Sequence, residues 1–287
     1  MRRSAGEWKL AGMGPIVVGY ERSKRSLDAL ALGVTLAHAR GTRLIAVYVD
    51  PDDQPFATID RAEQALARAD VARLKERAQP LLESLGGRAT FHSLADVSAP
   101  RALHDFARDE RASLLVVGST SAGPIRRVAV GSTAARLFVD APCPVAIAPR
   151  GFAERQPGTL ATVGVALDGK ADSAGALTQA AMIATDAGAV LRAVTVSPRW
   201  GRARRRVTAL ESEVDVLSER RGGAVERVRL RGRPGRALAK ASDGMDLLVV
   251  GCREEGAIQH PGSRSVSRQL VPASASPLLV VPEGLAR

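Results

Sequence analysis

A loop rich in glycine and hydroxyl residues follows one apolar segment of this 287-residue chain. Residues 113–118 form a buried-strand pattern, and Gly118 begins a loop that continues as Ser119-Thr120-Ser121. Gly131-Ser132-Thr133 comes thirteen residues after Gly118 and is expected to begin a helix. Glycine lets the backbone approach a ligand, and Ser or Thr at a helix start offers a hydroxyl beside free N–H groups. This combination predicts a phosphate-binding site.

Two acidic residues follow apolar strands in segments that resemble each other. Glu21 follows residues 15–20, and Asp168, which lies 147 positions after Glu21, follows residues 161–167. The sequence Leu-Leu-Val-Val-Gly also occurs twice, ending at Gly118 and at Gly251. Internal similarity at such spacings indicates a duplicated domain. We expect domains at 14–150 and 159–283, separated by a stretch rich in proline and glycine.

Each copy alternates apolar strand patterns with amphipathic helix patterns. In the first copy we expect strands at 15–20, 43–49, 88–94, 113–118 and 144–149, and helices at 24–40, 59–85, 100–110 and 132–139. In the second copy we expect strands at 161–167, 189–196, 224–231, 246–251 and 277–281, and helices at 173–187, 204–221, 234–243 and 264–271. This order predicts an α/β fold with parallel sheets. Ligands of such sheets bind at the C-terminal strand ends, where Glu21, Val49 and Gly118 are expected to meet.

The composition excludes several classes of protein. Hydrophobic residues make up 45% of the chain, but no apolar run has the length of a membrane helix, and no apolar signal segment follows the N-terminal basic residues. The two cysteines and four histidines show no metal-ligand spacing. We therefore expect a reduced, cytoplasmic protein without a metal site or membrane contact.

The chain carries a net charge of +11, mostly from arginine. A nucleic-acid partner is one interpretation, and arginines spread over solvated helix faces are the other. The scarcity of aromatic residues, at 3%, favours the solvated faces. The best candidates for an anion-binding face are the clusters at 202–206 and 229–236.

The glycine loop matches a known pattern. Gly118, Ser121 and Gly131-Ser132 lie where the universal stress protein (UspA) family has Gly, a second Gly, and Gly followed by Ser or Thr. Ser121 replaces the middle glycine. Residues 141–145, Ala-Pro-Cys-Pro-Val, also resemble the family's usual approach to its last strand. The likeness covers both copies, so the chain resembles the tandem two-domain form of this family.

The resemblance implies two adenine nucleotide alpha hydrolase-like domains, each a five-stranded parallel sheet flanked by helices. It implies ATP, or another adenine nucleotide, as ligand, with or without Mg²⁺. By this resemblance Glu21 approaches the ribose and phosphates and Val49 the adenine. The predicted nucleotide-binding set is Gly19, Tyr20, Glu21, Val49, Val117, Gly118, Thr120, Ser121, Gly131, Ser132 and Thr133.

The second copy departs further from the family pattern. Glu254 takes the place of the middle glycine and Arg264 that of the last one, while Asp168 keeps the acid. Negative charge at Glu254 opposes a bound phosphate. We therefore expect the first copy to be the better nucleotide site. The resemblance further implies that the last strands of the two copies pair within one chain; a homodimer beyond this pairing is left open.

The sequence favours a non-catalytic role. It contains neither a Gly-Lys-Ser/Thr phosphate loop nor a Ser-His-Asp pattern, and catalytic residues are not predicted. The first hypothesis is a stress-response protein that binds an adenine nucleotide mainly in its first domain. The alternatives are a nucleotide-free scaffold for protein contacts and a basic protein associated with nucleic acid.

Overall fold

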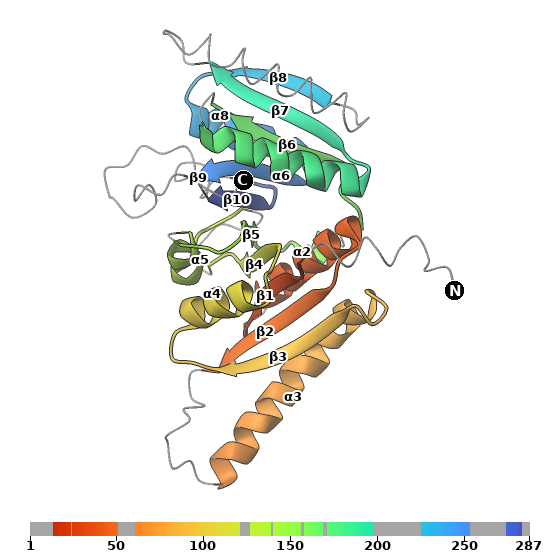
Figure 1. Cartoon of the computed structure of the whole chain (residues 1–287), viewed down its shortest axis with the longest axis vertical. Coiled ribbons are helices and arrows are strands. Elements are labelled where there is room, and N and C mark those ends of the chain that lie inside the picture. The colour runs from red at the N-terminus through yellow and green to blue at the C-terminus, as the bar shows by residue number, and fades with distance from the viewer. Residues whose placement is uncertain are drawn as a thin grey trace.

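One ten-stranded sheet runs through the whole molecule (Figure 1). The computed structural model describes residues 14–23, 25–50, 61–120, 127–138, 140–155, 158–168, 171–197, 225–252 and 274–282. The strand order is β3-β2-β1-β4-β5-β10-β9-β6-β7-β8. The strands are β1 (Ile16–Tyr20), β2 (Leu44–Asp50), β3 (Ala89–Ala95), β4 (Leu114–Gly118), β5 (Val145–Ala148), β6 (Thr162–Leu167), β7 (Val190–Ser197), β8 (Val225–Arg231), β9 (Leu247–Cys252) and β10 (Leu278–Pro282).

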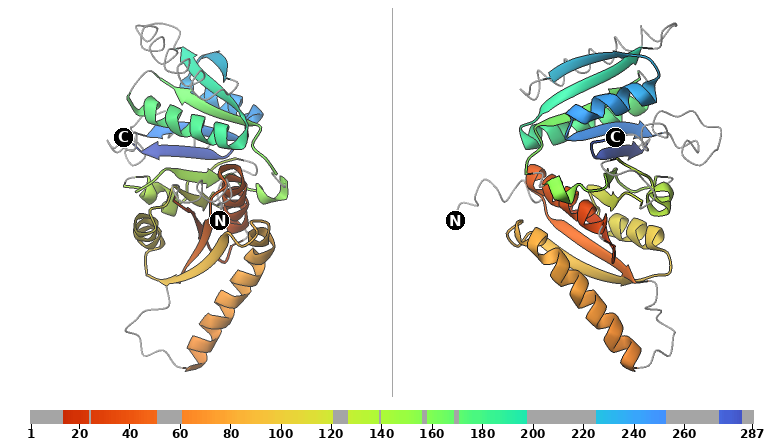
Figure 2. Two further views of the ribbon diagram at one scale, coloured as in Figure 1. Left: turned by 45° about the vertical axis from the view of Figure 1, so that its right-hand side comes forward. Right: turned by 180° about the vertical axis from the view of Figure 1, so that it is seen from behind.

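Helices cover both faces of this sheet, as the views in Figure 2 show. One face packs against α2 (Arg25–Arg40), α3 (Arg61–Glu83) and α6 (Ala171–Ala187). The other face packs against α4 (Ala99–Asp109), α5 (Ser132–Leu137) and α8 (Pro234–Ala241). Two short 3-10 turns, η1 (Ala153–Arg155) and η2 (Ser242–Gly244), complete the described elements. The predicted α/β architecture, with two five-stranded parallel halves, is confirmed.

Glycine ends the first helix of each half at equivalent places. Gly41 follows α2 with φ of 62°, and Gly188 follows α6 with φ of 65°. L-residues with a side chain rarely adopt this left-handed conformation, so glycine is suited to ending the helix and turning the chain into the next strand. The predicted bounds of the described elements agree with the structure to within two residues; the helix expected at 234–243 ends at Ala241, and the turn η2 follows it.

The two halves join edge to edge. Strands β5 and β10 pair antiparallel, with Ala146 opposite Leu279, and every other pairing in the sheet is parallel. Beside this joint, the buried guanidinium of Arg40 on α2 lies 3.7 Å from the Asp186 carboxylate on α6. Burial lowers the pKa of Arg40, and Asp186 partly offsets that effect.

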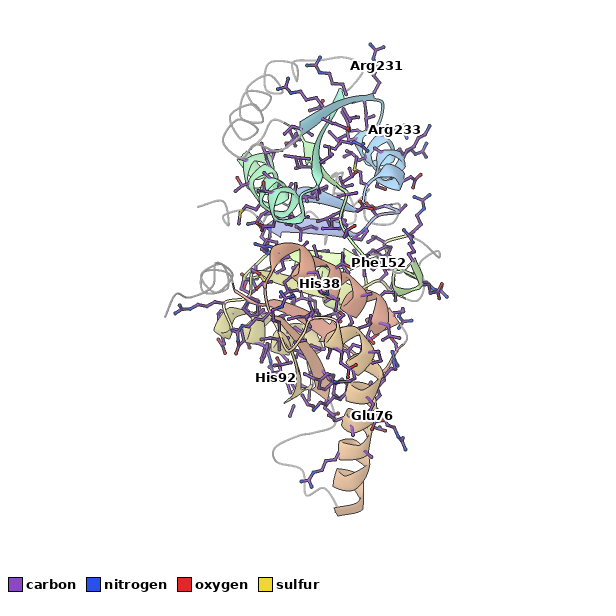
Figure 3. All side chains as sticks on the ribbon, turned by 90° about the vertical axis from the view of Figure 1, so that its right-hand side faces the viewer. His38, Glu76, His92, Phe152, Arg231 and Arg233 are labelled. Carbon is purple, nitrogen blue, oxygen red and sulfur yellow. The ribbon has the colours of Figure 1, made fainter. Side chains whose placement is uncertain are left out.

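Another contact fixes the chain between the two halves. The buried carboxylate of Asp28 on α2 accepts hydrogen bonds of 2.9 Å from the amides of Gly151 and Ala153. Phe152, between them, is buried against α2 and is labelled in Figure 3. The connection therefore leaves the first half in a defined direction.

Several expectations fall outside the described residues. They are the helices at 204–221 and 264–271, the arginine cluster at 202–206, and Ser121, Glu254 and Arg264. The first half has the longer connection between its second and third strands, because 51–88 separate β2 from β3 and 198–224 separate β7 from β8.

Candidate functional site

A cavity of about 500 Å³ opens at the C-terminal ends of β1, β2 and β4 in the first half. Five separate parts of the chain form its walls: the end of β1 with the turn after it, β2, the β3–α4 connection with the start of α4, the end of β4, and the start of α5. Ten of the eleven predicted residues line it, and Ser121 lies outside the described part of the chain. These ten are Gly19, Tyr20, Glu21, Val49, Val117, Gly118, Thr120, Gly131, Ser132 and Thr133.

Glu21, the acidic residue after β1, is exposed, and its carboxylate contacts two neighbouring side chains. The Glu21 carboxylate accepts a hydrogen bond from the Ser23 hydroxyl and lies 3.7 Å from the Arg25 guanidinium. The Ser26 hydroxyl donates to the backbone carbonyl of Glu21 at 2.7 Å. These contacts fold the turn after β1 so that Arg25 also lines the cavity.

Arg77 on α3 holds this turn from outside the cavity. Its guanidinium donates to the carbonyl oxygen of Arg22 at 2.9 Å and to that of Ser23. It also lies over the ring of Tyr20, 5.7 Å from the centroid. Sequence reasoning missed Arg77, because a charged residue on a long helix carries no local signal of a partner more than fifty positions away.

Tyr20 lies at the cavity wall, and its hydroxyl is buried. Burial raises the pKa of its hydroxyl, and the nearby Arg77 guanidinium only partly counters this. The hydroxyl is therefore protonated at neutral pH. The ring meets Phe91 edge to face, with centroids 6.0 Å apart, which fixes its orientation.

The two glycines of the loop have different reasons to be glycine. A Cβ atom on Gly118 would lie 2.9 Å from the carbonyl oxygen of Arg25, so packing requires its absence whether or not a ligand binds. A Cβ on Gly131 would meet only Thr120, at an ordinary 3.6 Å, and its φ of −83° suits any residue. Gly118 therefore packs closely against the start of α2, and it also lines the cavity.

The hydroxyl groups of the loop also differ. Ser119 is buried; its Oγ donates to the carbonyl of Ala148 at 2.7 Å and accepts from the amide of Ala129 at 3.1 Å. Ser132 is exposed at the cavity wall. The amides of Ser132 and Thr133 precede the first helical hydrogen bond of α5, which runs from Ala135 to Gly131. The residues able to face a ligand are therefore those at 131–133, and Ser119 supports them.

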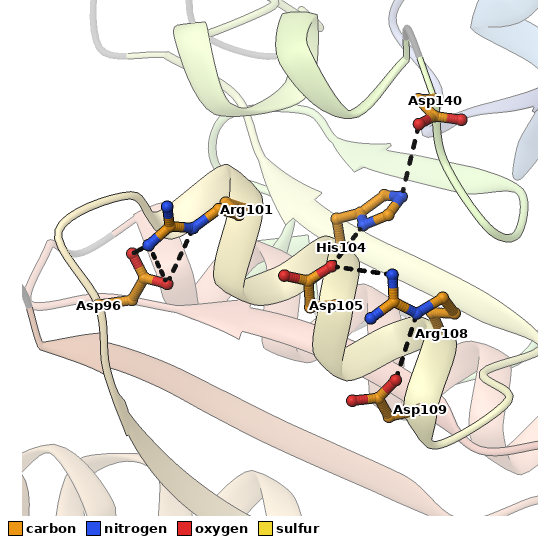
Figure 4. A network of polar contacts seen from close by, with 7 residues as sticks. All are labelled: Asp96, Arg101, His104, Asp105, Arg108, Asp109 and Asp140. Atoms are coloured by element: carbon orange, nitrogen blue, oxygen red, sulfur yellow. Dashed lines mark hydrogen bonds and ion pairs between the residues drawn. The ribbon is translucent and has the colours of Figure 1, made fainter.

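The β3–α4 connection supplies a wall that the sequence analysis did not predict. Asp96, Val97, Ala99 and Leu103 line the cavity. The Asp96 carboxylate accepts a hydrogen bond from the Ser98 amide at 2.8 Å. It accepts another from Arg101 at 2.9 Å (Figure 4). The Ser98 hydrogen bond, followed by Arg101, lowers the pKa of Asp96. Val97 is 64% exposed, which leaves an apolar side chain at the cavity mouth.

The other contacts in Figure 4 involve side chains of α4, including a hydrogen bond of 3.0 Å between His104 and Asp105. Within the described ranges, no group of three or more His, Cys, Asp or Glu side chains could hold a metal ion. Cys143 is buried, and burial raises the pKa of its thiol to about 12. That thiol is therefore un-ionised and unreactive at neutral pH.

The residues that follow the equivalent strands of the second half carry different charges. Asp168 accepts from the Ser173 hydroxyl at 2.8 Å, which keeps the acid after β6. Sheet register aligns Asp96 with Gly232, beside Arg231 and Arg233. Both arginines are exposed and project from the outer part of the second half (Figure 3). A carboxylate in the first half is thus replaced by cations in the second.

Comparison with known proteins gives the family. The universal stress protein family model matches residues 13–149 and, a second time, residues 160–282. The chain belongs to the universal stress protein family. A universal stress protein of Mycobacterium tuberculosis strain H37Rv is 28% identical over 290 residues, which cover 93% of this chain and 99% of the relative.

A solved universal stress protein shares its fold. The crystal structure of one from Archaeoglobus fulgidus DSM 4304 aligns with a TM-score of 0.71 and 20% identity, over 97% of this chain and all of that one. A shorter Archaeoglobus fulgidus universal stress protein, solved in complex with dAMP, aligns with 47% of this chain and 97% of its own, at 23% identity and a TM-score of 0.36. Among the described residues of the present universal stress protein, no helix has the length and apolarity needed to cross a membrane.

Proposed function

We propose that this universal stress protein binds an adenine nucleotide, ATP or a close relative, in the cavity of its first half. The observation that carries the proposal is the convergence of ten predicted residues on one cavity. Its volume of about 500 Å³ lies within the range of small-molecule sites, roughly 300–1,000 Å³. A nucleotide of this size would place its phosphates at an anion site and its base against an apolar surface.

The walls of the cavity divide by chemistry. Residues 131–133 offer hydroxyls and backbone amides to phosphates, and the arginines at 22 and 25 supply positive charge on the same cavity. Apolar side chains line other parts and suit a purine ring; they are Val47, Val49, Val97, Leu103 and Val117. Glu21 and Asp96 add oxygen acceptors suited to ribose hydroxyls. Mg²⁺ would take its ligands chiefly from phosphate oxygens and water, because it retains much of its hydration in such sites.

We propose that the nucleotide acts as an effector and not as a substrate. Hydrolysis requires a carboxylate or similar base positioned to activate water. Glu21 is held by Ser23 and Arg25, and Asp96 is held by Ser98 and Arg101. Because both carboxylates of the cavity have protein partners, rapid turnover is not expected.

Isothermal titration with ATP, with and without Mg²⁺, tests the proposal. We expect close to one ATP per chain, an affinity loss of about tenfold in Ser132→Ala from the lost hydroxyl contact, and no change in Asp168→Ala. Two equivalents per chain would mean that both halves bind ATP. Sensitivity to Asp168→Ala alone would place the site in the second half. Either result would contradict the proposal. Absence of binding, together with no nucleotide released from the denatured purified protein, would instead support a nucleotide-free scaffold.

A further inference from the structure

A short segment, residues 127–130, lies between the cavity of the first half and the surface of the second. On the cavity side, the amide of Thr120 donates to the carbonyl of Ala129 at 2.9 Å, and the amide of Ala129 donates to Ser119. The segment leads directly into residues 131–133, which form one wall of the cavity. Its position therefore sets the position of that wall.

The opposite side of the same segment is fixed by the second half. The amide of Val128 donates to the carbonyl of Ser274 at 2.9 Å, and Val128 is fully buried. The Arg127 guanidinium lies 3.2 Å from the Asp243 carboxylate. Neither Ser274 nor Asp243 lines the cavity. Two consecutive residues of the first half are thus attached to two separate parts of the second.

The second-half partners are themselves held together. Ser242, buried in η2 next to Asp243, accepts a hydrogen bond from the amide of Ala275 at 3.0 Å. The Ser274 hydroxyl donates to the carbonyl of Ser276 at 3.0 Å. This network joins η2 to the residues just before β10, so residues 127 and 128 meet two connected parts of the second half.

From these contacts we propose that Asp243 and Ser274 are positioning residues for the first-half ligand site. The second half thereby acts as a structural support for the neighbouring nucleotide site. The inference rests on the proposed function, since it concerns the same cavity. Because α5 has only six residues, its own helical bonds hold residues 131–133 weakly, and the attachments of residues 127–130 decide where these residues lie.

Arg127 has an alternative role, which predicts the opposite result. A guanidinium near the loop could clamp a polyphosphate directly. In the structure it is paired with Asp243 instead. If Arg127 were the clamp, removing the Asp243 charge would release it and strengthen ATP binding. If Asp243 positions the segment, the same change weakens binding.

The test is titration of ATP and of AMP into the full chain carrying Asp243→Asn. We expect both affinities to fall by about three- to fivefold, with an unchanged midpoint of urea unfolding, because the wall moves and the fold does not. Glu110→Gln is the matched control, since it breaks the Arg43–Glu110 ion pair of the same 3.2 Å length away from the cavity. Unchanged affinities, or tighter binding of ATP alone, would overturn the inference.

A second readout works without any nucleotide. Hydrogen exchange of a peptide covering residues 127–138 should be faster in Asp243→Asn than in the wild type and in Glu110→Gln, because the Val128 and Ala129 amides lose protection. Equal exchange in all three proteins would overturn the positioning role. If the wild type binds neither nucleotide, the proposed function fails, and the exchange result alone decides this inference.

Discussion

The two halves of the chain place equivalent strands in the same order but fill equivalent core positions differently. Sheet register aligns Val17 on β1 with Gly164 on β6. The same alignment pairs Ala112, before β4, with Met245, before β9. A Cβ on Gly164 would lie 2.2 Å from the Met245 sulfur, so the methionine occupies the space that a side chain on β6 would need. In the first half the larger side chain of the pair is on the strand, at Val17. In the second half it is before the adjacent strand, at Met245.

The helices over these strands show the same kind of exchange. A Cβ on Gly33 of α2 would lie 2.4 Å from Val18, so α2 packs very closely on β1. The equivalent residue of α6 is Ala180, which is fully buried. Equivalent positions of the two halves therefore accept side chains of different volume, provided that the space between the packed elements stays filled. By contrast, the aligned positions Asp96 and Gly232 differ in charge between the two halves.

The largest effect on stability is expected when the residue types of Val17 and Ala112 are introduced at Gly164 and Met245. Gly164→Val should destabilise by about 1–3 kcal/mol through overpacking, and Met245→Ala by about 2–4 kcal/mol through a cavity. The double variant recreates the Val17–Ala112 pair and should cost less than either single change. Urea unfolding of the three variants measures this. Additive losses in the double variant would show that the two positions do not exchange volume.

A smaller effect is expected at the two loop glycines. Gly118→Ala should destabilise by about 1–2 kcal/mol, because its Cβ meets a backbone oxygen. Gly131→Arg introduces the residue type found at Arg264, the equivalent position of the second copy. Because Gly131 meets only Thr120, the fold should be retained while ATP affinity falls at least tenfold. Unfolding curves and calorimetry separate the two effects; unchanged affinity in Gly131→Arg would place the ligand elsewhere.

The smallest effect on stability is expected at Asp96, which aligns with Gly232 in the second half. The pKa of Asp96 is lowered below its ordinary value of 3.8 in the folded state, so its ionised form stabilises the fold. That contribution is fully present above about pH 5 and is lost as the pH falls through the lowered pKa. The difference in urea midpoint between the wild type and Asp96→Asn should therefore shrink between pH 5 and pH 2. A difference independent of pH would mean that the contacts in Figure 4 do not depend on the charge.

The sequence predicted most of the framework because its signals are local. Apolar runs indicated the strands, and the helices expected at 24–40 and 173–187 end where predicted, just before Gly41 and Gly188. Strand ends that share one edge explain why Glu21, Val49 and Gly118 could be placed together in advance.

The rest of the site depends on side-chain packing between distant segments. Val97 and Leu103 reach the cavity only because β3 lies beside β2, and Arg77 reaches the turn after β1 only because α3 packs over that face. The separate roles of Gly118 and Gly131 depend on which atoms surround each one. No periodicity or motif in the sequence reports such contacts.

The antiparallel pairing of β5 with β10 also has a consequence for biosynthesis. The outer edge of β5 is covered only after β10, residues 278–282, has been translated. A nascent chain that has reached β9 but not β10 exposes two open hydrogen-bonding edges, on β5 and on β9. Ribosome stalling or premature termination in that interval would therefore yield a product prone to aggregation, even though the first half already contains all five of its strands.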